Sequence, residues 1–180
     1  WYLHRTPLKT EHSLTARPGH LTLFGGPYDI ATDEAVTMIA RRQTQFSGTF
    51  TVTVGHDAGA GGVGSSAGVA VWTSKYAFAS LGIRGKPGSP RELVFRHPVA
   101  QDDSFEVRAS ASRADRQEQV FPLHTNRPLV MTITATPFTY TFAAREQNST
   151  TVLAETTFSS RLLVRRRKFD SFMTGAHFAL

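Results

Sequence analysis

The carboxylate side chains are the residues with which this sequence could perform acid–base chemistry. The chain has fourteen Asp and Glu residues. Sandwich-fold enzymes that cleave glycans place two such groups on one strand face, about 5 Å apart when the reaction retains configuration. A Glu-x-Asp-x-x-Glu spacing does not occur here, and the densest group, Asp102, Asp103 and Glu106, lies where a loop enters a strand. Turn and edge charges are typical of such a position, so the sequence predicts no catalytic carboxylate pair.

The histidines and cysteines indicate no metal centre and no thiol chemistry. The seven histidines are scattered without the i, i+2 or i, i+4 spacing that brings ligands to one metal ion. The chain has no cysteine, which excludes a disulfide framework and a thiolate site. Asp170 alone is too little to argue for calcium. We therefore expect no catalytic residue, no metal and no cofactor in this chain.

Aromatic rings offer binding chemistry, because flat rings can lie under the C–H faces of sugars while polar groups reach the hydroxyls. The candidate carbohydrate-binding residues are Trp72, Tyr76, Phe78 and Tyr140. The alternative for each ring is the core, where aromatic residues are more often found. The alternation of Phe138, Tyr140 and Phe142 favours a core face for that segment.

The hairpin predicted over residues 67–85 decides where three of these rings point. Its strands meet at Thr73, Ser74 and Lys75. With a two-residue loop, Trp72 shares an apolar face with the aliphatic residues and belongs to the core. With a three-residue loop, the first strand changes parity, and Trp72 joins Tyr76 and Phe78 opposite an aliphatic face. The sequence leaves both registers open.

Short β-type segments must position all of these residues. Alternation is clear in residues 48–54, where Phe50, Val52 and Val54 face opposite to three threonines. Further strands are expected over 20–25, 36–43, 67–85, 91–97, 104–111, 128–136, 138–144 and 150–156. With no long helical pattern, this predicts an all-β fold, a jelly-roll β-sandwich of two antiparallel sheets.

The length and the charge of the chain limit the classes of protein to which it can belong. The 180 residues, of which 40% are hydrophobic, suit one domain over 1–180. The net charge of +6 depends on a basic run, Arg161 and residues 165–168. We interpret this run as a solvated loop, with a glucuronic acid-bearing polysaccharide as the alternative partner. We expect no nucleic-acid partner and no membrane partner, because neither a recognition motif nor a long apolar segment occurs.

Four segments of the sequence resemble one known family. They are WYLHRTPLKTEHSLTARPGHLTLFGGPY at 1–28, IARRQTQFSGTFTVTV at 39–54, AGVAVWTSKYAFASLGIRG at 67–85 and FMTGAHFAL at 172–180. They are similar to the C-terminal concanavalin A-like module of fungal family 43 glycoside hydrolases, the β-xylosidase and α-arabinofuranosidase group. The resemblance implies a concanavalin A-like sandwich that follows a catalytic β-propeller in a longer, secreted enzyme. The Asn148-Ser149-Thr150 sequon permits secretion.

The resemblance also implies two roles for the chain, neither of them catalytic. In that family the module packs against the propeller, and related modules bind xylan. Arg41, Arg42 and Gln43 lie in one of the segments that resemble the family. Three large polar groups at the end of a strand need partners, so we assign them to the domain interface. We therefore expect an accessory module of a hemicellulose-degrading hydrolase with an exposed apolar patch. The alternative is an autonomous module that binds xylan or arabinoxylan, or a lectin.

Overall fold

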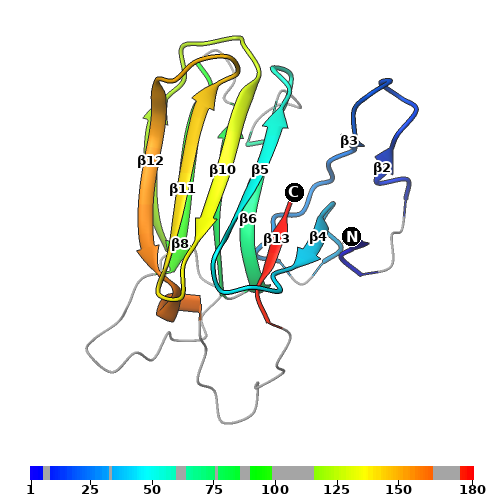
Figure 1. The fold of residues 1–180 in the computed structure, drawn as a ribbon. Coiled ribbons are helices and arrows are strands. Elements are labelled where there is room, and N and C mark those ends of the chain that lie inside the picture. Colours follow the sequence, from blue (N-terminus) through cyan, green and yellow to red (C-terminus); the bar gives the residue numbers. More distant parts are fainter. Residues whose placement is uncertain are drawn as a thin grey trace.

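The computed structural model consists of two antiparallel sheets packed face to face, with an N-terminal segment beside them (Figure 1). It describes residues 1–5, 9–32, 34–59, 64–75, 77–85, 90–98, 116–163 and 175–180. This architecture confirms the predicted all-β sandwich. In the described part of the chain, no helix is long and apolar enough to cross a membrane.

The larger sheet has seven strands in the order β1-β4-β13-β6-β7-β8-β9. Their bounds are β1 Tyr2–Leu3, β4 Ile39–Arg42, β13 His177–Ala179, β6 Ser66–Ser74, β7 Ala77–Arg84, β8 Glu92–Pro98 and β9 Arg116–Pro122. The smaller sheet has the order β12-β11-β10-β5. Its strands are β12 Val152–Ser159, β11 Thr139–Glu146, β10 Leu129–Ala135 and β5 Gly48–Val54. The 3-10 turn η2, Ser160–Leu163, follows β12.

The core lies between the two sheets and follows from the alternation of the strands. Phe95 of β8 and Phe142 of β11 are fully buried, with ring centroids 5.3 Å apart. Phe50, Val52 and Val54 of β5 pack against this core, as predicted. The opposite face of the smaller sheet carries threonines, and Thr51 lies opposite Thr132 with their hydroxyls hydrogen-bonded at 3.3 Å. Burying one face of each sheet therefore holds the layers together.

A second, smaller core lies on the outer face of the larger sheet. Met38, Ala40, Ala70 and Ala179 are buried there, and Ile30, Val36 and Trp72 pack against them. The N-terminal residues thus cover part of this face, and their two-stranded sheet, β2 (His12–Ser13) and β3 (Thr22–Leu23), stands beside the sandwich in Figure 1. We call residues 9–28, which include β2 and β3, the N-terminal arm.

Several strands were not predicted from the sequence. Strand β9 has the sequence RQEQVFP, in which the first four residues are polar, so that no alternation of apolar and polar residues indicates a strand. Strands β1, β2 and β13 contain only two or three residues each, too few for an alternation to be recognised. The strand predicted over 104–111 lies outside the described residues, as does the group Asp102, Asp103 and Glu106.

Candidate functional site

Six of the seven predicted site residues meet at one end of the sandwich. Arg42 lies opposite His177, and His177 lies opposite Trp72 on the next strand. The two sheets meet at this end through a hydrogen bond between Tyr140 and Gln43. We call it the β6–β7 end, because β4, β6 and β10 finish here and β5, β7, β11 and β13 begin here; it is the lower end in Figure 1. The seventh residue, Tyr76, lies outside the described residues.

The β6–β7 hairpin gives Trp72 the face predicted for a three-residue loop, but neither predicted register occurs. Trp72 pairs with Phe78, Ser74 pairs with Ala77, and the register shifts between Trp72 and Ser74. Thr73 is thus the extra residue of a bulge, and its hydroxyl donates to the Ala77 carbonyl at 2.7 Å. Trp72 and Phe78 consequently share the outer face of the larger sheet, and the aliphatic residues face inward; these are Val69, Val71, Ala79, Leu81 and Ile83.

Phe78 and Tyr140 do not form a sugar platform in this structure. Phe78 is 0% exposed and Tyr140 is 6% exposed, so neither ring presents a face to a ligand. Tyr140 points into the sandwich, stacks on Phe158 at 5.7 Å and donates its hydroxyl to the Gln43 Oε1 atom at 2.7 Å. Burial raises the pKa of Tyr140, and the hydrogen bond with Gln43 partly opposes that rise. Both rings belong to the core, the alternative considered for them above.

Trp72 is partly buried within a cluster of rings on the outer face. The His4 ring meets it nearly edge-on, with centroids 4.8 Å apart, and the His177 ring lies 6.2 Å away. Tyr2 in turn meets His177 edge-on at 5.4 Å. The two strands that bring these rings beside Trp72, β1 and β13, are the short ones that the sequence did not reveal.

The pKa values of both histidines in this cluster are lowered. His177 is buried, which lowers its pKa; the Arg42 charge lowers it further, while backbone groups of Trp72 and Gly175 act in the opposite direction. Within the described residues, its Nδ1 atom has no hydrogen-bond partner. Burial also lowers the pKa of His4, with Arg5 adding to the effect. Both shifts favour the uncharged ring, and the Arg42 guanidinium lies at the edge of the cluster.

The three predicted interface residues divide into two kinds. Gln43 is satisfied within the chain, since its amide donates to the Gln45 carbonyl at 2.8 Å and its carbonyl accepts from Tyr140. Arg41 and Arg42 are exposed, and within the described part of the chain neither guanidinium makes a hydrogen bond or an ion pair. Only the two arginines therefore remain available to a partner.

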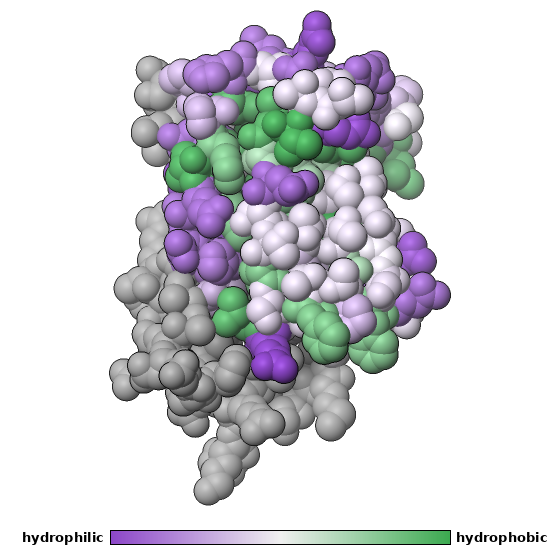
Figure 2. Space-filling view, turned by 60° about the vertical axis from the view of Figure 1, so that its left-hand side comes forward, coloured by the Kyte–Doolittle hydropathy of each residue, from purple (hydrophilic) through white to green (hydrophobic). Residues whose placement is uncertain are grey.

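Two strongly exposed phenylalanines lie at the same end. Phe46, between β4 and β5, is 81% exposed, and Phe138, between β10 and β11, is 71% exposed. Figure 2 shows hydrophobic side chains at the lower right edge of the coloured surface, below a pale, weakly polar area. The sequence pattern placed Phe138 on a core face, which is wrong because the residue precedes β11 and lies in the turn. Six other exposed apolar residues lie in the first 28 positions, and two lie in strands β9 and β12: Trp1, Tyr2, Leu14, Leu21, Phe24, Tyr28, Val120 and Val152.

Catalytic groupings do not appear in the part of the chain that the structure describes. No three His, Asp or Glu side chains there could hold one metal ion. Residues 64–68, GSSAG, match the Gly-x-Ser-x-Gly pattern of a serine nucleophile. Ser66, however, begins strand β6 instead of standing in a turn between a strand and a helix. The pattern is therefore part of a β-hairpin, and it supplies no nucleophile elbow.

The comparison with protein families decides the identity of this sandwich. The model of the β-xylosidase C-terminal concanavalin A-like domain matches residues 1–180. The chain belongs to this family. The match over residues 1–180 and the sandwich fold confirm the β-xylosidase C-terminal family that the sequence resemblance implied.

Solved structures support the fold of this family member. A family 43 glycoside hydrolase protein from Bacillus licheniformis, BlXynB, matches with a TM-score of 0.73 and 15% identity, over 97% of this chain and 31% of its own. A xylan β-1,4-xylosidase from Bacillus halodurans matches with a TM-score of 0.70 and 15% identity, over 93% of this chain and 30% of its own. The chain thus spans about a third of the length of these proteins. No match was found among curated proteins.

Proposed function

We propose that this chain is the non-catalytic accessory module of a glycoside hydrolase of the β-xylosidase or α-arabinofuranosidase type, and that it packs on a catalytic β-propeller. The family match over residues 1–180 carries the proposal. The proteins with similar structures are about three times as long, which leaves room for a catalytic domain outside the matched region.

The β6–β7 end supplies the docking surface in this proposal. Phe46 and Phe138 are large apolar side chains that water surrounds, and burying such rings against a second domain is favourable. Arg41 and Arg42 stand on β4, close to this end, and their guanidinium groups have no hydrogen bond or ion pair among the described residues. A surface that combines exposed aromatic rings with unpaired arginines is typical of protein interfaces, in which both residue types are enriched.

The docking proposal is tested by variants of the longer enzyme. Phe46→Ser and Phe138→Ser should lower the thermal unfolding midpoint of the enzyme, yet leave the 180-residue chain almost unchanged, because both rings are exposed in the chain alone. Val152→Ser removes another exposed apolar side chain, from a strand of the smaller sheet, and serves as the control. Equal midpoints for the enzyme and both phenylalanine variants would contradict docking at this end.

We also propose that the module is secreted, in keeping with a polysaccharide substrate outside the cell. Asn148 of the sequon is exposed in the turn between β11 and β12, with a left-handed φ of 64°. The Ser149 amide donates to the Glu146 carbonyl across that turn at 3.1 Å. Expression through a eukaryotic secretory pathway should add a glycan that Asn148→Gln removes, and an unmodified wild-type mass would contradict the use of this site.

A further inference from the structure

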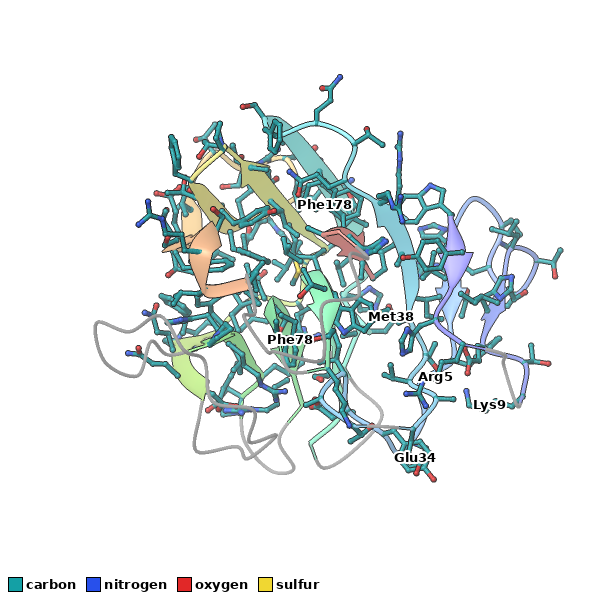
Figure 3. All side chains as sticks on the ribbon, turned by 90° about the horizontal axis from the view of Figure 1, so that it is seen from below. Arg5, Lys9, Glu34, Met38, Phe78 and Phe178 are labelled. Atoms are coloured by element: carbon teal, nitrogen blue, oxygen red, sulfur yellow. The ribbon has the colours of Figure 1, made fainter. Side chains whose placement is uncertain are left out.

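A cleft beside β6 and β7 is separate from the β6–β7 end. Its volume is about 840 Å³, and it is lined by the N-terminal arm, by β6 and β7 of the larger sheet, and by the end of β5 with the loop that follows it. Met38, which lines the cleft, stands between the sandwich and the N-terminal strands in Figure 3. A volume of this size is within the range of pockets that bind small molecules.

The floor of the cleft is low because its residues have small side chains or none. Gly68 of β6 lies directly opposite Gly82 of β7, and Ala70 lies opposite Ser80. At Gly68 a side chain is excluded by the neighbouring strand, since a Cβ atom would stand 2.2 Å from the Leu81 carbonyl oxygen. The two strands therefore pack backbone against backbone at this point, and the space above them is left open.

One wall of the cleft is a fixed network of paired charges. Arg96 Nη1 contacts Asp29 Oδ2 at 2.8 Å, and Arg96 Nε contacts Glu118 Oε1 at 2.9 Å. Arg84 binds Glu92 and Glu118, each at 3.0 Å. Asp29 directly follows the arm and also accepts the Ala31 amide at 2.9 Å, and its contact with Arg96 ties the end of the arm to β8. These contacts hold the guanidinium groups in place before any ligand arrives.

The arm forms the opposite wall and brings apolar surface to the cleft. At its tip, Arg17 Nη1 lies 3.5 Å from Asp57 Oδ1 in the loop after β5. Tyr28 lines the cleft and is half exposed, and Leu21 and Leu23 line it as well. The cleft thus combines an aromatic ring and aliphatic side chains with donors and acceptors on the facing wall.

The balance of charge selects the class of ligand. Each arginine that lines the cleft, Arg17, Arg84 and Arg96, is paired with at least one carboxylate. An anionic ligand would therefore gain little net attraction and would compete with those carboxylates. A neutral sugar has hydroxyls that accept from guanidinium and donate to carboxylate, and C–H faces that pack on Tyr28. We propose that this cleft binds a neutral oligosaccharide, and the choice of xylose units rests on the function proposed above.

The test is a titration of the 180-residue chain with xylotetraose, in which binding is monitored through the amide signals in NMR spectra. We expect saturable shifts at residues that line the cleft, and a loss of affinity of about tenfold on Tyr28→Ala, in line with about 1.4 kcal/mol for one ring–sugar contact. Arg17→Ala, which removes the contact at the tip of the arm, should also weaken binding. Phe138→Ala is the matched control, because it removes an exposed ring at the other end of the sandwich.

Three outcomes would overturn the proposal. The first is the absence of saturable shifts at millimolar xylotetraose. The second is a preference for glucuronic acid-substituted oligosaccharides that disappears with added salt, which would indicate an anion site. The third is binding that Trp72→Ala abolishes and Tyr28→Ala leaves intact. None of these concerns docking, because the catalytic domain is absent from the titration and docking is measured on the longer enzyme.

Discussion

The hydrogen bond from Tyr140 to Gln43 links the smaller sheet to the end of β4, and its loss should be measurable. Tyr140→Phe removes a 2.7 Å bond without changing the packing of the ring, so the free energy of unfolding should fall by about 1 kcal/mol. Gln43→Leu should cost at least as much, because it leaves the buried hydroxyl without an acceptor. Urea unfolding measures both changes, with Tyr28→Phe at a half-exposed ring as control. An unchanged midpoint for Tyr140→Phe would contradict this role.

His177 should make the stability of the module depend on pH. Its pKa in the folded chain lies below the ordinary value near 6.5, because of burial and then of Arg42. Below about pH 6.5 the unfolded chain therefore binds a proton that the folded chain resists. The free energy of unfolding should be fully maintained above that pH and should decrease as the pH falls from about 6.5 towards the lower folded pKa.

The pH effect is tested by measuring the slope of the free energy of unfolding against pH, between pH 7.5 and pH 5, for wild type and variants. His177→Phe should flatten the decrease, whatever its effect on stability at neutral pH, because the ring next to Tyr2, Trp72 and Arg42 no longer titrates. Val152→Ser changes an exposed side chain that does not titrate and should leave the slope as it is. Parallel curves for wild type and His177→Phe would rule out His177 as the source.

Residue types could be predicted from the sequence better than their exposure. Arg41 and Arg42 were expected to need a partner, and the structure leaves both without one inside the described chain. Phe78, for which both a sugar site and the core were considered, is fully buried, and Phe138, expected on a core face, is exposed. Exposure depends on where a strand begins and on what covers its outer face. The contact of His4 with Trp72 had no signal in the sequence, since it joins residues 68 positions apart.

At the scale of the elements, the close approach of β6 and β7 makes a sharp prediction. Gly68→Ala places a Cβ atom 2.2 Å from a backbone oxygen, so one strand must shift, at a cost of about 2–3 kcal/mol. Gly48→Ala is the matched control, because nothing lies within 4 Å of its Cβ position at the start of β5. The comparison is made by chemical denaturation, and an equally mild effect of both substitutions would show that the strands do not approach this closely.

The strands themselves were largely predictable, and the register of the hairpin was not. Alternation in residues 48–54 and 128–136 identified β5 and β10, because one face of each is apolar. The parity of β6 depends on the single bulge at Thr73, and both registers gave an apolar face, so hydrophobicity could not select between them. The bulge places Trp72 on the outer face of the larger sheet.

In the whole molecule, two separate surfaces suit two different partners, a protein and a sugar. The β6–β7 end carries Phe46, Phe138 and the unpaired arginines, which suit a protein surface. The cleft under the N-terminal arm carries paired charges and Tyr28, which suit a neutral sugar. Both partners could engage at once, because the residues of β6 and β7 that line the cleft lie towards the ends of these strands that are remote from the β6–β7 turn. Most of the basic run at 161–168 lies outside the described residues, so its interpretation as a solvated loop stays a prediction.

The central claim is that this family member docks on a catalytic domain through the β6–β7 end. Hydrogen–deuterium exchange, measured on the 180-residue chain and on the longer enzyme that contains it, tests this claim most directly. If the module docks there, we expect slower exchange in the longer enzyme for peptides covering 43–48 and 136–139, and equal exchange for the β11–β12 turn at 147–150. Equal exchange at the β6–β7 end in both proteins, or protection confined to another surface, would contradict the claim.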